Sequence, residues 1–253
     1  MKNWIAILLS LALVLSMTAC GTPEVPVPTE ENTKATEPPT PETTKPIELP
    51  TIPTDDPDAQ IEALVETALS TLTSEYEALV ARVDSYEAYI KHQEEIAAYY
   101  KSTVAVSEAL CQQMYAFALA YTENILTSGA STDDMYDDME IVYDLIYDDM
   151  GDEIYDGIYD GVLDDLYDDF YDGVLDDQPD GVEYSDWADA RSDEYEQWAD
   201  SRSDTYDHWA DFRSDVYDLW ADVRSDLWDD NLEGALEELE DFRADVEKML
   251  SKA

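Results

Sequence analysis

Basic residues are scarce in this chain: 13 Lys and Arg stand against 62 Asp and Glu in 253 residues, which gives a formal net charge of −49. A chain this anionic does not neutralise nucleic-acid phosphates, and anionic lipid head groups do not attract it. The composition therefore excludes DNA and RNA as partners.

The residue types that build compact catalytic sites are also few, with 2 Cys, 2 His and 8 Gly. Gly-rich phosphate loops, paired-Cys zinc motifs and nucleophile elbows are absent from the sequence. Carboxylates are so abundant that no pair of them stands out from its background. We therefore expect that the protein is not an enzyme.

Apolar residues are plentiful by comparison, at 45% of the chain, and aromatic residues make up 11% with 18 Tyr and 6 Trp. A fully disordered acidic chain is poor in both classes. The sequence thus has enough apolar surface to bury a core.

The amino-terminal residues carry the most specific motif. Lys2 precedes an apolar run over residues 5–17, and two small residues stand directly before Cys20. This order is typical of an export signal, and Met-Thr-Ala-Cys-Gly resembles the lipobox of bacterial lipoproteins. The resemblance implies that residues 1–19 are a signal peptide and that Cys20 carries lipid at the outer face of a bacterial plasma membrane. The alternatives are a secreted protein with a chance cysteine and an uncleaved anchor.

Residues 20–58 contain ten of the 11 prolines, mixed with Thr and acidic residues. Such a segment cannot bury a core, and we expect a disordered, extended linker behind the lipid anchor. This stalk would hold the remainder of the chain away from the membrane.

Residues 59–130 predict one long heptad helix. No Pro or Gly interrupts the sequence as far as residue 127, and apolar residues recur at spacings of three and four, with a four-residue stutter between Leu72 and Leu79. Gly129 is expected to end this helix, and Ser131 is expected to cap the next one.

Residues 131–181 repeat a tetrad of an apolar residue, Tyr, Asp, and then Asp or Gly, and they contain 20 acidic residues without any Lys or Arg. A strand would place Asp and apolar residues on the same face, so a helix is the better interpretation. Because four residues overshoot an α-helical turn of 3.6, the apolar stripe should drift by about 40° per tetrad.

Residues 182–253 contain an eleven-residue repeat that begins at Tyr184, Tyr195, Tyr206 and Tyr217. In each repeat an Arg follows a Trp by four residues and precedes the next aromatic residue by four, so its guanidinium is expected to stack between the two rings. These Arg are also placed to meet the anionic tetrad segment. The candidate partner-binding residues are Trp187, Arg191, Trp198, Arg202, Trp209, Arg213, Trp220 and Arg224.

Three interpretations of this aromatic and basic stripe are open. Packing inside a helical bundle is favoured, because each predicted helix has one stripe that needs a partner. Self-association is the second, and a platform for glycan, peptide or a membrane interface is the third.

Metal binding and thiol chemistry are weaker hypotheses. Asp176 and Asp180 occupy EF-hand-like positions before Gly181, but Trp187 stands where a bidentate Glu would be needed, so discrete Ca²⁺ binding is less favoured than a solvated acidic face. Cys111 lies among apolar residues at helical spacing and is expected to be a buried, inert thiol.

The sequence as a whole predicts an all-α protein: an elongated, antiparallel, three-helix, coiled-coil-like bundle behind the stalk. Its expected role is non-enzymatic, as a membrane-anchored extracytoplasmic lipoprotein that has a structural or interaction function and binds cations or cationic partners through its acidic helices. The alternative is a surface module that binds Ca²⁺ or glycan. No other cofactor is expected.

Overall fold

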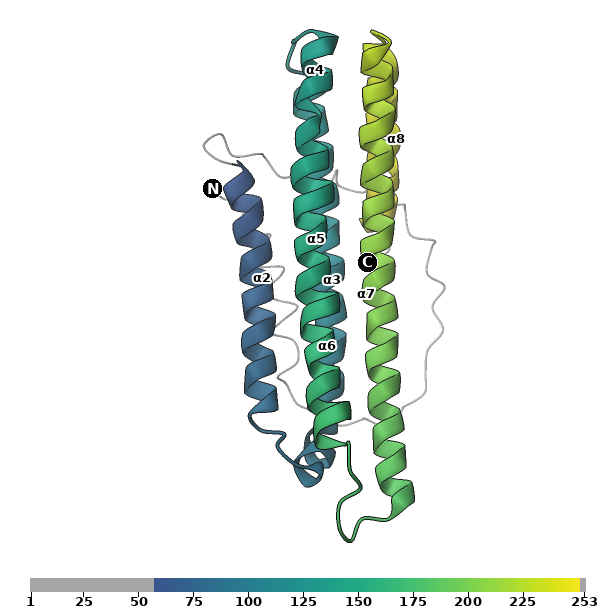
Figure 1. The fold of residues 1–253 in the computed structure, drawn as a ribbon. Helices are drawn as coiled ribbons and strands as arrows, with labels where there is room; N and C mark the ends of the chain where they lie inside the picture. Colours follow the sequence, from purple (N-terminus) through teal and green to yellow (C-terminus); the bar gives the residue numbers. More distant parts are fainter. Residues whose placement is uncertain (1–56, 251–253) are drawn as a thin grey trace, which may run out of the picture.

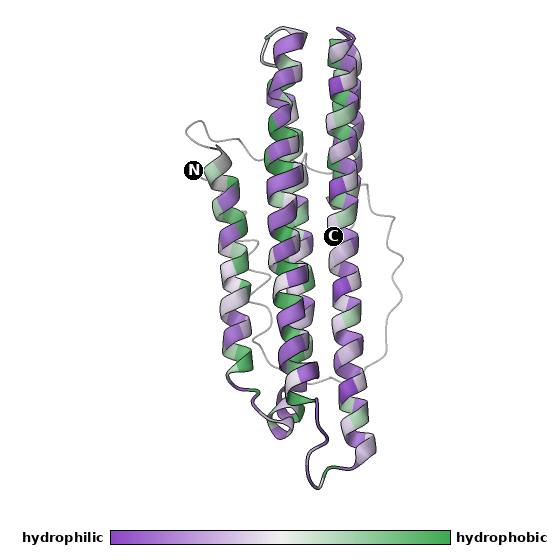
Figure 2. Ribbon diagram, in the orientation of Figure 1, coloured by the Kyte–Doolittle hydropathy of each residue, from purple (hydrophilic) through white to green (hydrophobic). Residues whose placement is uncertain are grey.

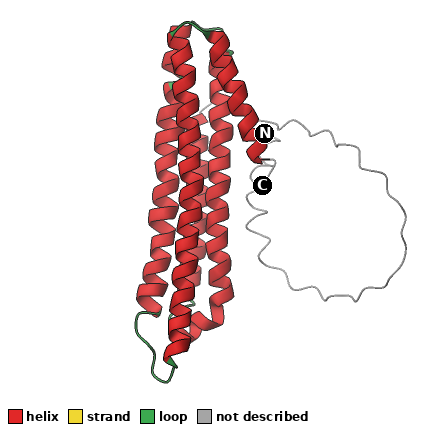
Figure 3. Cartoon of the chain, turned by 90° about the vertical axis from the view of Figure 1, so that its right-hand side faces the viewer, coloured by secondary structure: helices red, strands yellow, loops and turns green. Residues whose placement is uncertain are grey.

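The computed structural model describes residues 57–250, and these residues form helices and connecting turns without any strand. Figure 3 shows an elongated bundle in which only short loops join the helices. The all-α prediction is confirmed for this part of the chain, whereas the predicted number of three helices is wrong, because the same residues form five. Three predictions concern residues outside this range: the signal peptide, the lipidation of Cys20 and most of the stalk.

Four of the five helices have simple bounds: α2 (Pro57–Val80), α3 (Tyr86–Leu126), α7 (Tyr184–Trp228) and α8 (Leu232–Leu250). The remaining helix, which we call the tetrad helix, covers residues 132–174 and changes its winding along its length. Its segments are α4 (Thr132–Asp138), η2 (Val142–Asp149), α5 (Met150–Ile154), η3 (Tyr155–Val162), α6 (Leu163–Leu166) and η4 (Tyr167–Val174).

Three long helices run side by side, with α3 and α7 parallel and the tetrad helix antiparallel to both (Figure 1). The short helix α2 packs on α3 and the tetrad helix, and α8 packs on α3 and α7. Hydrophobic and hydrophilic residues alternate along each helix in Figure 2, as amphipathic helices require. The core contains the following fully buried side chains: Tyr89, Tyr100, Phe117, Phe170, Phe212, Ile61, Leu72, Ile96, Leu110, Met114, Leu119 and Met135.

The prediction of one continuous helix over residues 59–130 is wrong, because the chain turns between Val80 and Tyr86. Ser85 adopts an extended conformation there, and its side chain accepts the Ala88 N–H, which caps α3. The turn folds α2 back against α3 and the tetrad helix, and these two helices bury the apolar stripe of α2. A single 70-residue helix would leave part of that stripe in water.

Both predicted signals at the next turn are confirmed. Gly129 has a φ of 78°, which glycine adopts without steric cost, and α3 ends three residues before it. The Ser131 side chain accepts the Asp134 N–H at 3.2 Å. Gly181, in the turn that follows the tetrad helix, also has a positive φ, at 85°.

The tetrad segment is helical, as predicted, but its winding differs from the expected α-helix. Three eight-residue π-helical segments, η2, η3 and η4, alternate with short α-helical ones. A π-helix bonds residue i to i+5 and so takes more residues per turn than an α-helix. The mixture brings the average close to the four-residue repeat of the sequence.

This winding removes the predicted drift of the apolar stripe. Seven successive tetrads place their apolar residue in the core, each at most 4% exposed: Ile146, Met150, Ile154, Ile158, Val162, Leu166 and Phe170. The helix unwinds to follow the sequence, because a drifting stripe would bring apolar residues into water and Asp into the core.

The π segments give two glycines opposite expected responses to substitution. A Cβ on Gly161, in η3, would lie 2.8 Å from the backbone oxygen of Asp156, whereas a Cβ on Gly151, in α5, would meet only ordinary contacts from 3.5 Å outward. We expect Gly161→Ala to lower the free energy of unfolding by about 1 kcal/mol or more, because backbone atoms must shift to relieve the clash. Gly151→Ala is the matched control and should raise it by about 0.5 to 1 kcal/mol, as in an ordinary helix. Urea unfolding measures both, and stabilisation by both substitutions would contradict the π winding.

Candidate functional site

The four arginines of the repeats, Arg191, Arg202, Arg213 and Arg224, form an arginine ladder between α7 and the tetrad helix. Each guanidinium stacks on the Trp four residues before it and on a Tyr of the tetrad helix. Distances from the guanidinium carbon to the ring centroids are 4.0 Å (Tyr171) and 5.7 Å (Trp187) for Arg191, 3.8 Å (Tyr159) and 5.2 Å (Trp198) for Arg202, 4.1 Å (Tyr147) and 5.2 Å (Trp209) for Arg213, and 3.8 Å (Tyr136) and 4.8 Å (Trp220) for Arg224.

The predicted stacking on the Trp four residues before each Arg is therefore confirmed, whereas the predicted second ring is wrong. The second ring comes from the tetrad helix and not from the next aromatic residue of α7. The guanidinium groups turn toward that helix because its carboxylates lie there. The ion pairs join Arg191 to Asp172 and Asp176, Arg202 to Asp160 and Asp164, Arg213 to Asp148 and Asp152, and Arg224 to Glu140.

The partners on the two helices follow different periods. Successive ladder arginines are 11 residues apart on α7, whereas their stacking partners Tyr147, Tyr159 and Tyr171 are 12 residues apart. The fourth partner, Tyr136 in the α-helical segment α4, is 11 residues before Tyr147, so the difference in period applies to the first three levels. Eleven α-helical residues rise about 16.5 Å. Twelve residues of the tetrad helix fit the same length because wider turns rise less per residue. The near-repeat of twelve residues and the repeat of eleven are both visible in the sequence, but only the structure joins them into one 12-to-11 register.

Aromatic rings fill the space between the ladder arginines. The Tyr155 and Tyr159 rings stack with 4.7 Å between their centroids, and the Tyr155 ring lies 4.6 Å from that of Trp209. The same group of two Tyr and one Trp recurs one repeat before and one repeat after. The Trp209 Nε1–H also donates to the Gly151 carbonyl at 2.8 Å, and the Trp187 Nε1–H donates to the Leu175 carbonyl at 3.0 Å.

The structure thus places all eight candidate partner-binding residues in an internal interface, in agreement with the favoured interpretation of the stripe. The outer edge of this interface is still open to solvent. Tyr184, Tyr195, Tyr206 and Tyr217 are 66%, 49%, 45% and 43% exposed.

The two metal candidates are not brought together into a site. Asp176 lies 3.7 Å from the Arg191 guanidinium, which also donates to its backbone oxygen, and Asp180 stands in the turn before Gly181. Across residues 57–250, no group of three or more His, Cys, Asp or Glu side chains is arranged to hold a metal ion.

Cys111 is buried, as predicted. Its side chain is 3% exposed, and burial raises the pKa of the thiol to about 12. The thiol therefore stays protonated at neutral pH, in agreement with the predicted inert role.

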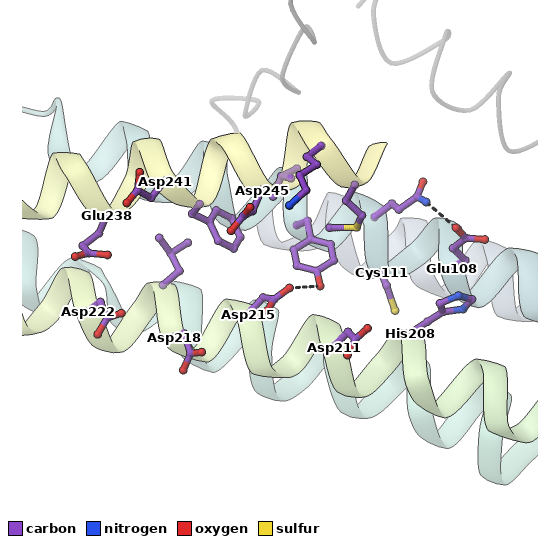
Figure 4. A pocket seen from close by; sticks show the side chains of 17 residues that line it. Glu108, Cys111, His208, Asp211, Asp215, Asp218, Asp222, Glu238, Asp241 and Asp245 are labelled. Carbon is purple, nitrogen blue, oxygen red and sulfur yellow. Dashed lines mark hydrogen bonds between the residues drawn. The ribbon is translucent and has the colours of Figure 1, made fainter. Parts of the chain in front are cut away.

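A second candidate site, which the sequence interpretation missed, lies between α3, α7 and α8. It is a groove of about 530 Å³ whose floor includes Tyr115, Leu219 and Phe242. Figure 4 shows carboxylates of α7 on one side and of α8 on the other. We call it the acidic groove, and its facing carboxylates are Asp211, Asp215, Asp218, Asp222, Glu238, Asp241 and Asp245.

Like charges face each other across the acidic groove. Lys248 is the one Lys or Arg among the residues that line it. Burial and then the charges of Asp222 and Asp226 raise the pKa of Glu238. Burial also raises the pKa of Asp215, although the Tyr115 hydroxyl donates to that carboxylate at 2.9 Å and opposes the shift. The signal in the sequence was the helical spacing of these carboxylates on both helices, which the abundance of Asp concealed.

Comparisons with protein-family models, curated proteins and solved structures found no match for this chain. Among the described helices, none combines the length and the apolar character needed to span a membrane.

Proposed function

We propose that this protein is a membrane-anchored, extracytoplasmic lipoprotein with a non-enzymatic interaction role, and that its acidic groove binds a cationic protein or peptide segment or divalent cations. The observation that carries the proposal is the contrast between two acidic surfaces. Seven carboxylates of residues 131–181 pair with the four arginines of the ladder, whereas the seven facing carboxylates of the acidic groove share one Lys.

A cationic ligand would relieve the repulsion in the groove. The raised pKa values of Asp215 and Glu238 indicate that their ionised forms are disfavoured, and a positive charge between α7 and α8 would favour them. A strong negative field also speeds the encounter with a cationic partner and repels anionic ones. The apolar floor offers contact for the aliphatic part of Lys or Arg side chains.

The shape of the body supports a spacer role in the same protein. The 45-residue helix α7 is about 68 Å long, and three long helices pack side by side in a coiled-coil-like bundle. In this proposal Cys20 carries the lipid, and the Pro/Thr-rich residues 20–58 form a stalk between the lipid and the helices. Together these segments would hold the acidic groove away from the membrane.

Titration of the mature protein in mild detergent with an oligolysine peptide tests this proposal. We expect binding that weakens at least about tenfold between roughly 30 mM and 300 mM salt, because screening reduces the attraction. Neutralising one wall of the groove with Asp211→Asn, Asp215→Asn, Asp218→Asn and Asp222→Asn should weaken binding at low salt by about tenfold or more.

The matched control carries the same change of four charges elsewhere: Asp137→Asn, Asp144→Asn, Asp156→Asn and Asp168→Asn, all exposed on the tetrad helix. Equal loss in both variants would show diffuse attraction and contradict a groove site. Mass spectrometry of the same preparation tests the anchor, since an acylated amino-terminal Cys20 is expected and an unmodified one contradicts it.

A further inference from the structure

A buried carboxyl group lies at the end of the bundle where α3 and α7 begin. Glu194 of α7 is 0% exposed. Its two carboxylate oxygens accept hydrogen bonds from two tyrosine hydroxyls of α3, Tyr89 at 2.8 Å and Tyr100 at 2.6 Å. This group takes no part in the acidic groove or the arginine ladder.

Packing alone does not call for a carboxyl group at this position. Glu194 is the last residue of the first eleven-residue repeat, and the equivalent residues of the later repeats are Thr205, Val216 and Leu227. All of these side chains are buried. The first repeat therefore places an ionisable group where the other three place uncharged ones.

The surroundings of Glu194 provide hydrogen bonds but no positive charge. Tyr89 and Tyr100 are the titratable groups that face it from α3, and from the tetrad helix Phe170 packs edge-on against Tyr89 with 6.2 Å between ring centroids. The adjacent carboxylate on α7, Asp193, acts on the Tyr89 hydroxyl. Within residues 57–250, no Lys, Arg or His makes an ion pair with Glu194.

We propose that Glu194 is a proton-controlled lock: when protonated it holds α3 against α7, and when ionised it loosens this end of the bundle. The protonated acid can be buried at little cost, whereas the carboxylate must leave water with only two neutral donors to replace it. Opening the end of the bundle returns the charge to solvent.

The direction of the pH dependence follows from the environment of the carboxyl group. Burial raises the pKa of Glu194 above its ordinary value, and the hydrogen bonds from Tyr100 and Tyr89 oppose the shift without cancelling it. The closed state therefore binds the proton more tightly than the open state. Closure is strongest below the ordinary Glu pKa, weakens as pH rises through the raised pKa, and is constant above it.

Hydrogen exchange of the full mature chain tests this lock. After correction for the intrinsic rates, peptides that cover residues 86–104 and 184–201 should exchange up to about tenfold faster for each pH unit within the window between the ordinary and the raised pKa. Peptides of the far ends of α3 and α7 should show a smaller change.

Three variants separate the lock from the general acidity of the protein. Glu194→Gln keeps the shape and cannot ionise, so it should abolish the pH dependence of these peptides. Asp215→Asn removes a different carboxyl group, which accepts a hydrogen bond from Tyr115 of α3, and should leave the dependence intact. Tyr100→Phe removes one donor to the carboxylate and should extend the dependence to higher pH. An unchanged dependence in Glu194→Gln, or none in the wild type, would overturn the proposal.

Discussion

Replacement of the four ladder arginines by glutamine (Arg191→Gln, Arg202→Gln, Arg213→Gln and Arg224→Gln) is expected to detach the tetrad helix from α7 at neutral pH and low salt. Residues 131–181 contain 20 acidic residues and no Lys or Arg, so these side chains supply most of the positive charge that reaches the tetrad helix. The side chains of the four ladder arginines are only 13% to 21% exposed, and each also stacks on two rings.

The expected effect is comparable with the whole stability of a domain. A partly exposed ion pair contributes about 1 kcal/mol, and a cation–π contact contributes about 0.5 to 1 kcal/mol. With one ion pair and one cation–π contact counted for each of the four arginines, the loss is about 6 to 8 kcal/mol, against a typical total of roughly 5 to 15 kcal/mol. Circular dichroism during urea unfolding measures it.

Salt and acid should rescue the glutamine variant, because both reduce repulsion among the carboxylates that the arginines had neutralised. The matched control replaces the same residues by lysine, which keeps the charge but loses the planar stacking, and should lose less stability. A glutamine variant as stable as the wild type at low salt, or one that neither salt nor acid rescues, would contradict a structural role for the ladder.

Local chemistry was sufficient to predict much of the fold. Ser131 and Gly129 marked a helix start and a helix end because a cap and a positive φ depend on single residues. The tetrads predicted a helix because only helical periodicity separates their apolar residues from Asp. The repeats predicted that Arg213 stacks on Trp209, since both residues lie on one helix.

Features that depend on contacts between helices could not be predicted in the same way. The turn before Tyr86 lets α2 bury its stripe against α3 and the tetrad helix, which no property of residues 81–85 alone requires. The π winding arises because the tetrad helix must keep its stripe against the core and its carboxylates against α7. An isolated α-helix has 3.6 residues per turn, which would make the stripe drift, and the contacts in the bundle prevent this drift.

The candidate sites differ in the same way: some of their residues can be recognised on a single helix, and others only from contacts between helices. The ladder residues were identifiable, but the ring that Arg202 stacks on, Tyr159, belongs to a helix whose register was unknown. The acidic groove needed the packing of α8 on α7, and Glu194 needed the two tyrosines of α3. In the sequence alone, the groove carboxylates and Glu194 do not differ from the many other acidic residues of the chain.

Between Tyr147 and Tyr171, the tetrad helix and α7 pair at twelve residues against eleven. Tyr171 faces Tyr195, Tyr159 faces Tyr206 and Tyr147 faces Tyr217, with ring centroids 5.8 Å, 6.0 Å and 5.7 Å apart. An ordinary pairing of eleven against eleven that begins at Tyr171 would instead place residue 160 opposite Tyr206 and residue 149 opposite Tyr217.

Cysteine cross-linking distinguishes the two registers most directly. Three chains with Cys20→Ser and Cys111→Ala would carry Tyr171→Cys with Tyr195→Cys, Tyr159→Cys with Tyr206→Cys, or Tyr147→Cys with Tyr217→Cys. The control chains would pair Asp160→Cys with Tyr206→Cys and Asp149→Cys with Tyr217→Cys. With a short bifunctional thiol reagent, all three tyrosine-derived pairs should cross-link to a similar extent and both control pairs should react poorly. Efficient cross-linking of the Asp149→Cys and Tyr217→Cys pair, with loss of the Tyr147→Cys and Tyr217→Cys product, would contradict the 12-to-11 register.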